Sequence, residues 1–132
     1  MGLAQKEGGT RQIENLIGPK GIVTALLSFE TGEQAVFEIP FPFKANILAL
    51  ESIVIKALSA TDAGTITPAN SVGNITGGTL THAASAAQGD KQTAATLTAN
   101  TVIAKDTDLK LTPAKTTVAG KVQVTVHYQR VL

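Results

Sequence analysis

The chain has 132 residues, with no cysteine and no tryptophan, and its 11 basic and 10 acidic residues leave a net charge of +1. This length fits one domain that can bury a core without disulfides or metals. The absence of cysteine excludes disulfides and thiolate metal sites, and the balanced charge excludes the basic footprint that nucleic-acid binding requires.

Residues 1–21 are predicted to form an arm that precedes the folded body. Ile13, Leu16 and Ile17 lie at helical spacing in this otherwise polar and glycine-rich stretch. The arm is either a loose terminus or a tether that orders on a neighbouring subunit or partner. Its three apolar residues are candidate contacts in the second case.

The predicted body, residues 22–132, begins with two alternating stretches. Residues 23–29 and residues 35–41 place apolar side chains at every second position. A Thr-Gly pair at 31–32 supplies a tight turn between them, so the two stretches are predicted to form a β-hairpin. The IPFPF segment at 39–43 is predicted at a sheet edge or a corner, because proline donates no ladder hydrogen bond.

Residues 47–58 form a long apolar stretch with few interruptions. Its β-branched run at 53–55 favours a strand that is covered on both faces for part of its length, although 47–51 alone could also be helical. This stretch and the IPFPF segment hold more apolar side chains than one core face needs. For each single residue, an ordinary core position is the alternative to a contact surface. With the arm included, the candidate interface residues are Ile13, Leu16, Ile17, Phe41, Phe43, Leu48 and Leu50.

The rest of the chain continues the strand rhythm. Residues 63–100 contain short Thr-rich pieces bounded by turn residues at a spacing of about ten, which is typical of sandwich strands. Residues 109–112 alternate before Pro113, and residues 121–129 alternate valine with polar side chains, which predicts a strand with one buried face. The pieces add up to an all-β fold: a two-sheet β-sandwich, jelly-roll-like, with about eight strands and the N-terminal arm.

Little in the chain suggests catalysis. A Ser-His-Asp arrangement would need one of the two histidines, His82 or His127, as its base. Neither lies in a nucleophile-elbow context, and His127 is predicted on the polar face of the last strand. No catalytic residue is therefore predicted, and the chain is not expected to be an enzyme.

Metal, cofactor and membrane sites are not predicted either. Asp106 and Asp108, with Asp62 and Asp90 in other loops, could offer oxygens to calcium, but the spacing departs from an EF-hand loop. Aspartates at turns more often cap backbone amides. No apolar run approaches the roughly 20 residues of a membrane span. We therefore expect no metal, no cofactor, no nucleic acid and no membrane partner.

A sugar-binding face would normally present aromatic side chains. Phe29, Phe37, Phe41 and Tyr128 fall on positions that alternation directs inward. Phe43 alone is left over for a surface role. A flat face that binds sugars remains physically possible, but this composition does not favour it.

Several segments together resemble a known group of proteins. They are AVFEIPFPFKANILALESIVIKAL, AGTITPAN, GNITGGTLTHAASAAQGD, TAATLTANTVIAKDTDLKLT and AGKVQVTVHYQ. In order and character, over about residues 22–131, the chain resembles small structural proteins of tailed bacteriophages, in particular the capsid cement or decoration proteins, some of them jelly rolls.

The resemblance implies a non-enzymatic protein on the outer surface of the capsid in the virion. Its implied partner is the major capsid protein, which it binds and stabilises against the internal pressure of the DNA, often as a homo-oligomer such as a dimer or trimer. An alternative is a head-fibre or tail module that binds host-surface glycans. The resemblance assigns no functional role to any individual residue of this chain.

Overall fold

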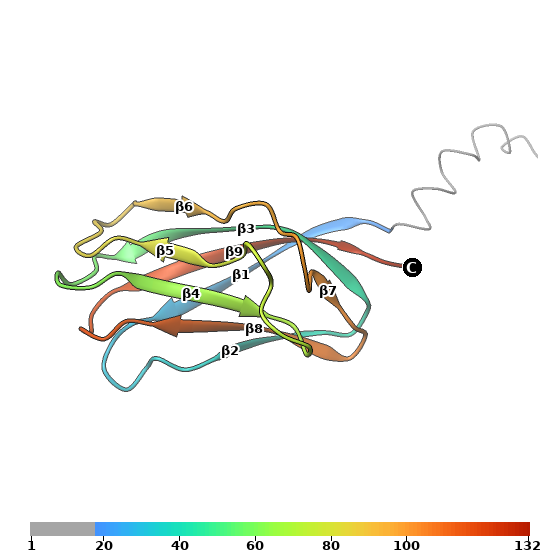
Figure 1. Ribbon diagram of the computed structural model, residues 1–132, viewed down its shortest axis with the longest axis horizontal. Helices are drawn as coiled ribbons and strands as arrows, with labels where there is room; N and C mark the ends of the chain where they lie inside the picture. The colour runs from blue at the N-terminus through green and yellow to red at the C-terminus, as the bar shows by residue number, and fades with distance from the viewer. Residues whose placement is uncertain (1–17) are drawn as a thin grey trace, which may run out of the picture.

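The computed structural model describes residues 18–132, which form nine β-strands and no helix (Figure 1). Most of the predicted arm, including Ile13, Leu16 and Ile17, lies outside the described residues. The strands are β1 (Lys20–Ser28), β2 (Phe37–Phe41), β3 (Ala45–Lys56), β4 (Gly64–Ala69), β5 (Leu80–His82), β6 (Lys91–Thr93), β7 (Val102–Ile103), β8 (Thr107–Ala114) and β9 (Lys121–Arg130).

The strands form two antiparallel sheets that enclose the core between them. The first sheet has the order β1-β9-β3-β6, with β7 also paired to β3, and the second has the order β2-β8-β4-β5. Figure 1 shows β1, β9 and β3 in one layer and β2, β8 and β4 in the other. The predicted two-sheet β-sandwich is confirmed, with nine strands in place of about eight. The jelly-roll topology stays a prediction.

The last strand follows its sequence pattern. Val122, Val124 and Val126 are fully buried on β9, while the polar residues between them are only partly covered. Branched valine side chains pack well on a pleated surface. β9 pairs with β1 on one side and with β3 on the other, so it is an inner strand of the first sheet. The prediction of a strand with one buried face is confirmed.

The predicted hairpin between residues 23–29 and 35–41 is wrong. β1 pairs with β9, from Lys20 opposite Gln129 to Ser28 opposite Lys121, whereas β2 pairs with β8 in the other sheet. The backbone turns at Gly32, where φ is +77°, but this connection crosses from one sheet to the other. Alternation shows which side chains point inward and does not identify the partner strand.

The proline-containing segment lies at a sheet edge, as predicted. β2 is the outermost strand of the second sheet and contains Pro40. Ile39 and Phe41 are buried, but Phe37 is exposed although its parity is the inward one. It stands at the first position of an edge strand, which has a neighbour on one side only.

The long apolar stretch forms β3, a strand between β9 on one side and β6 and β7 on the other, so the helical alternative for 47–51 is excluded. Two register shifts interrupt its pairing with β9, one between Ile47 and Ala49 and one between Val54 and Lys56. Leu48 and Ile55 are exposed. The predicted cover on both faces is therefore wrong at these two positions, whose side chains lie outside the core between the sheets.

The Thr-rich middle is only partly strand. β4 matches its predicted piece, and β8 runs on through Pro113, which was predicted to end it. β5 and β6 have three residues each. The connection between β6 and β7 instead follows β3 by single hydrogen bonds, from the Ala94 amide to the Leu50 carbonyl and from the Ile47 amide to the Thr101 carbonyl.

Both described ends lie at the same end of the sandwich (Figure 1). The Arg130 amide donates to the Pro19 carbonyl at 2.9 Å, and the Gln129 side chain donates to the Gly18 carbonyl at 3.1 Å. Gly18 has a φ of +87°, and a Cβ there would lie 2.2 Å from the Arg130 carbonyl oxygen. Glycine is therefore required where the chain enters β1 beside the end of β9.

Candidate functional site

The side of the first sheet that points away from the core, here called the outer face, mixes apolar and polar side chains. Its residues are Ile22, Thr24, Leu26, Leu48, Glu51, Ile53, Ile55, Lys91, Thr93, Gln123, Thr125 and His127. Strand pairing aligns them in rows, so that Thr24, Thr125 and Glu51 stand side by side. Ile22, Leu26, Leu48 and Ile55 are exposed. Exposed apolar side chains that share one face mark a candidate contact surface.

The structure separates the predicted interface residues. Phe41 and Leu50 lie in the core, where strand alternation directs them, so as folded here they offer no contact surface and the core alternative holds for them. Phe43 is partly buried against the core. Leu48 lies on the outer face and is 38% exposed, so among the described candidates it is the one left open for a partner.

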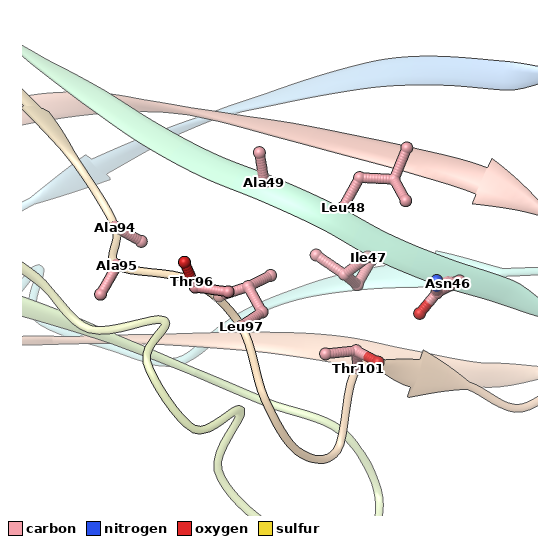
Figure 2. Close-up of a pocket in the computed structure, with 9 residues that line it drawn as sticks. All are labelled: Asn46, Ile47, Leu48, Ala49, Ala94, Ala95, Thr96, Leu97 and Thr101. Carbon is pink, nitrogen blue, oxygen red and sulfur yellow. The ribbon is translucent and has the colours of Figure 1, made fainter.

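Leu48 owes its exposure to a β-bulge. The register shift between Ile47 and Ala49 leaves Leu48 without an opposite residue on β9, and such an extra residue bends the strand locally. A hollow of about 450 Å³ lies between this bulge, the start of β1, and His127 and Tyr128 on β9. A second hollow of about 430 Å³ lies between the bulge and residues 94–101 (Figure 2). The bulge therefore places an exposed apolar side chain, Leu48, between two hollows.

An aromatic cluster closes the nearby end of the sandwich. The rings of Phe41 and Tyr128 meet edge to face at a centroid distance of 5.4 Å, and Phe43 packs on both. The Arg130 guanidinium lies 5.0 Å from the centroid of the Phe43 ring, within the range of a cation–π contact. Phe43, the aromatic that the sequence left over, thus packs against other protein groups.

A Ser-His-Asp arrangement joins the two sheets, with Ser52 and His82 buried and Asp90 partly exposed. The Oγ of Ser52, on β3, lies 2.6 Å from Nε2 of His82, on β5, and Nδ1 of His82 lies 2.9 Å from Oδ2 of Asp90. The hydrogen bond from His82 is the largest cause that lowers the Asp90 pKa, followed by one from Gln92. With Asp90 ionised, its carboxylate accepts a hydrogen bond from Nδ1 of His82, while Nε2 of the same ring is hydrogen-bonded to the Ser52 hydroxyl.

The bonding order of this arrangement is that of a hydrolase triad, but its surroundings differ. His82 is fully buried, and Ser52 is buried on the inward side of β3. A nucleophilic serine must reach a substrate atom about 3 Å away, and here the hydroxyl points between the sheets. The geometry therefore fits a polar link between the sheets. Ser52 lies 30 residues before His82, and none of the three residues stands in a nucleophile motif, so no sequence signal could have found the arrangement.

His127 stands where the sequence placed it, on the polar side of β9. Its Nε2 lies 3.0 Å from Oε1 of Glu51 on the neighbouring strand β3. Both side chains are substantially exposed. This pair belongs to the outer face and gives it a polar centre between its apolar residues.

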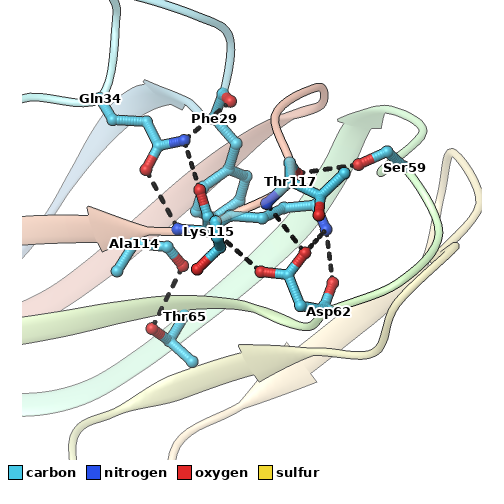
Figure 3. Close-up of polar contacts among 9 residues, drawn as sticks. Phe29, Gln34, Ser59, Asp62, Thr65, Ala114, Lys115 and Thr117 are labelled. Carbon is cyan, nitrogen blue, oxygen red and sulfur yellow. Dashed lines mark hydrogen bonds and ion pairs between the residues drawn. The ribbon is translucent and has the colours of Figure 1, made fainter.

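A second polar cluster lies at the opposite end of the sandwich from Gly18 (Figure 3). The Lys115 side chain is fully buried, and its Nζ donates to Oδ1 of Asp62 at 3.1 Å and to the Asp62 carbonyl. Asp62 also accepts from the amides of Thr116 and Thr117, at 2.7 and 3.0 Å. The Gln34 side chain bonds both backbone groups of Lys115. Three connections between the strands are tied together by these contacts.

These contacts change the acidity of Asp62. Partial desolvation opposes its ionisation, but the hydrogen bonds from Lys115, Thr117 and Thr116 outweigh that effect and lower its pKa to about 2. The expectation that turn aspartates cap backbone amides is confirmed at Asp62. The burial of Lys115 was missed, because a lysine in a threonine-rich loop is ordinarily exposed.

Among residues 18–132, no three histidine, aspartate or glutamate side chains gather as a metal site would need. The calcium candidates Asp62 and Asp90 are held by Lys115 and His82. In the described part of the chain there is also no helix of the length and apolarity needed to span a membrane.

Comparison with known proteins finds a similarity in structure and none in sequence. No protein-family model matches the chain, and no curated protein matches its sequence. Among solved structures, the fold is similar to that of a chain in the structure titled "Cyanophage Pam1 capsid asymmetric unit". The two share 16% sequence identity over 86% of each chain, with a TM-score of 0.51. At this identity the likeness shows a shared fold.

Proposed function

We propose that the protein is a structural component of a bacteriophage virion that binds the capsid shell from outside and stabilises it, without enzymatic activity. One observation carries the proposal: the sandwich shares its fold with a chain of a cyanophage capsid asymmetric unit. The segment-by-segment resemblance to phage cement and decoration proteins supports the same role independently of the structural comparison. The implied partner is the major capsid protein.

The outer face is the surface that suits this role. It offers exposed apolar residues such as Leu48 beside hydroxyl and charged groups such as Thr125 and Glu51. Such a mixture gives weak individual contacts, and a symmetric shell repeats them many times, so that avidity replaces a single strong site. The three apolar residues of the arm, Ile13, Leu16 and Ile17, would add a second contact on the shell.

A charge at the bulge should weaken attachment. Leu48→Lys is expected to lower the affinity for shells by roughly tenfold or more, because a desolvated charge would replace an apolar contact. Binding is measured by co-sedimentation with empty shells assembled from the major capsid protein of the same genome. Val72→Lys is the matched control, since Val72 is 81% exposed but lies in a turn after β4, away from the outer face.

Two results would count against the proposal. If Leu48→Lys bound shells as well as the unaltered protein, the outer face would not be the contact surface. Failure of the unaltered protein to sediment with shells, together with saturable binding on a glycan array, would favour the alternative role in a head fibre or tail.

Removal of residues 1–17 should separate folding from attachment. The truncated protein is expected to keep its β-sheet circular-dichroism spectrum, because residues 18–132 contain both complete sheets, yet to bind shells more weakly. A full-length variant with Ile13, Leu16 and Ile17 all replaced by serine keeps the length and is expected to match the truncation. Full binding by both proteins would show that the arm is no tether.

A further inference from the structure

β1 is an edge strand whose outward side has no strand partner among the described residues. The Arg130 amide donates to the Pro19 carbonyl, and the Phe29 amide donates to the Gly120 carbonyl. In an antiparallel pair these bonds alternate, so the odd-numbered residues of β1 bond to β9. The amides and carbonyls of the even-numbered residues therefore point away from the sheet, and they belong to Lys20, Ile22, Thr24, Leu26 and Ser28.

The other edges are protected in ways that β1 is not. β2 contains Pro40, and the edge strands β5, β6 and β7 have three residues or fewer. Short length and proline are the usual devices that prevent edge-to-edge pairing. β1 has nine residues, no proline and a single charged side chain, at Lys20.

Two side chains on this edge are large and apolar. Ile22 is 62% exposed and Leu26 is 56% exposed, and both stand on the same side of the strand with Thr24 between them. A long edge strand with exposed apolar side chains pairs readily with another strand. The spacing Ile-x-Thr-x-Leu reads as apolar-polar-apolar in both directions, so the edge is complementary to itself.

We propose that β1 pairs with β1 of a second copy of this chain, antiparallel and centred on Thr24. In this register Thr24 faces the partner's Thr24, Ile22 faces the partner's Leu26, and Lys20 faces the partner's Ser28. No like charges meet, and apolar and hydroxyl cross-strand pairs both stabilise sheets. The contact is isologous, so it closes as a dimer in which the first sheets of both copies become one. This proposal does not depend on capsid binding.

Neighbouring registers fit less well. Centring the pair on Leu26 would oppose Ile22 to the partner's Glu30. Centring it on Ile22 would oppose Leu26 to the partner's Gly18, which lies before β1 begins. Only the register centred on Thr24 uses all nine residues of the strand, and it therefore makes the most main-chain hydrogen bonds.

The first test measures the mass of the full-length protein by sedimentation equilibrium over about 1 to 100 µM, a range suited to a small interface. A dimer is expected. Thr24→Pro should raise the dimer dissociation constant by roughly tenfold or more, because it removes an outward amide from both copies. That amide does not bond to β9, so the sheet keeps its own hydrogen bonds. Leu48→Lys, on the same face but on β3, two strands in from the edge, should still dimerise.

The second test fixes the register and does not require a disruptive substitution. The chain has no cysteine, so Thr24→Cys introduces one thiol, whose Cα would lie about 5.5 Å from that of the partner's residue 24, within disulfide range. Mild oxidation should give a covalent dimer for Thr24→Cys and none for Leu48→Cys.

The outcomes separate cleanly. A dimer that Thr24→Pro weakens and that Thr24→Cys locks supports the proposal. A monomer over the whole concentration range, a trimer, or equal cross-linking by Leu48→Cys overturns it. Because Thr24→Cys is a small change, its result stands even if Thr24→Pro fails to fold.

Discussion

Replacing His82 with alanine is expected to lower the free energy of unfolding by about 3–4 kcal/mol. The imidazole is fully buried and bonds Ser52 on the first sheet and Asp90 before β6. Its removal leaves a cavity between the sheets and a buried hydroxyl without a partner, and both effects destabilise the fold. Urea unfolding followed by circular dichroism at neutral pH measures the change.

His127→Ala is the matched control, because it removes the other histidine, which is partly exposed and paired with Glu51 on the surface. It should cost less than about 0.5 kcal/mol. Ser52→Ala should cost about 1 kcal/mol and leave any background ester hydrolysis unchanged. Turnover that disappears in Ser52→Ala and His82→Ala would instead show that the buried arrangement is catalytic.

The second large effect is expected at Asp62. Asp62→Ala should lower the thermal midpoint by roughly 10 °C or more, because it leaves the buried Lys115 ammonium without its carboxylate partner. Lys115→Met should change the midpoint by less than about 3 °C, since it removes the buried charge and leaves Asp62 bonded to the amides of Thr116 and Thr117. Equal losses in the two variants, measured by differential scanning calorimetry, would contradict this asymmetry.

Asp62 also makes stability depend on pH. Its pKa is about 2 in the folded protein and 3.8 ordinarily, so its contribution is present above about pH 4 and is lost as the pH falls through about 2. The lowered pKa of Asp90 acts in the same direction. The stability gap between the unaltered protein and Asp62→Asn should therefore narrow between about pH 5 and about pH 2. Parallel urea midpoints over this range would refute the assignment.

The parts of the fold that could be predicted from sequence are those that depend on a single strand. Alternating valines in β9 identify a strand and its buried face, and the turn chemistry of Asp62 identifies a cap, because both signals are local. Strand partners are not local. The alternation of residues 23–29 and 35–41 predicts two strands, and both are present as β1 and β2, yet these strands belong to different sheets.

The polar clusters could not be predicted for the same reason. Ser52, His82 and Asp90 meet only after the two sheets have packed, and nothing near Lys115 in the sequence distinguishes it from an exposed lysine. The sequence also could not predict which leucine of β3 is exposed on the outer face, because Leu48 and Leu50 have the same parity and similar neighbours. A bulge at Leu48 turns one outward, while its neighbour two positions later lies in the core.

The shared location of the two described ends has a practical consequence. Because Gly18 and Leu132 lie at one end of the sandwich, a protein fused directly to either of these residues would be carried at that end. The turn at Gly32 lies at the far end, and a Cβ there would meet no atom within 4 Å. A peptide inserted at Gly32 would project away from such a fusion. A single chain could therefore be immobilised through one end of the sandwich while it displays an epitope at the other end.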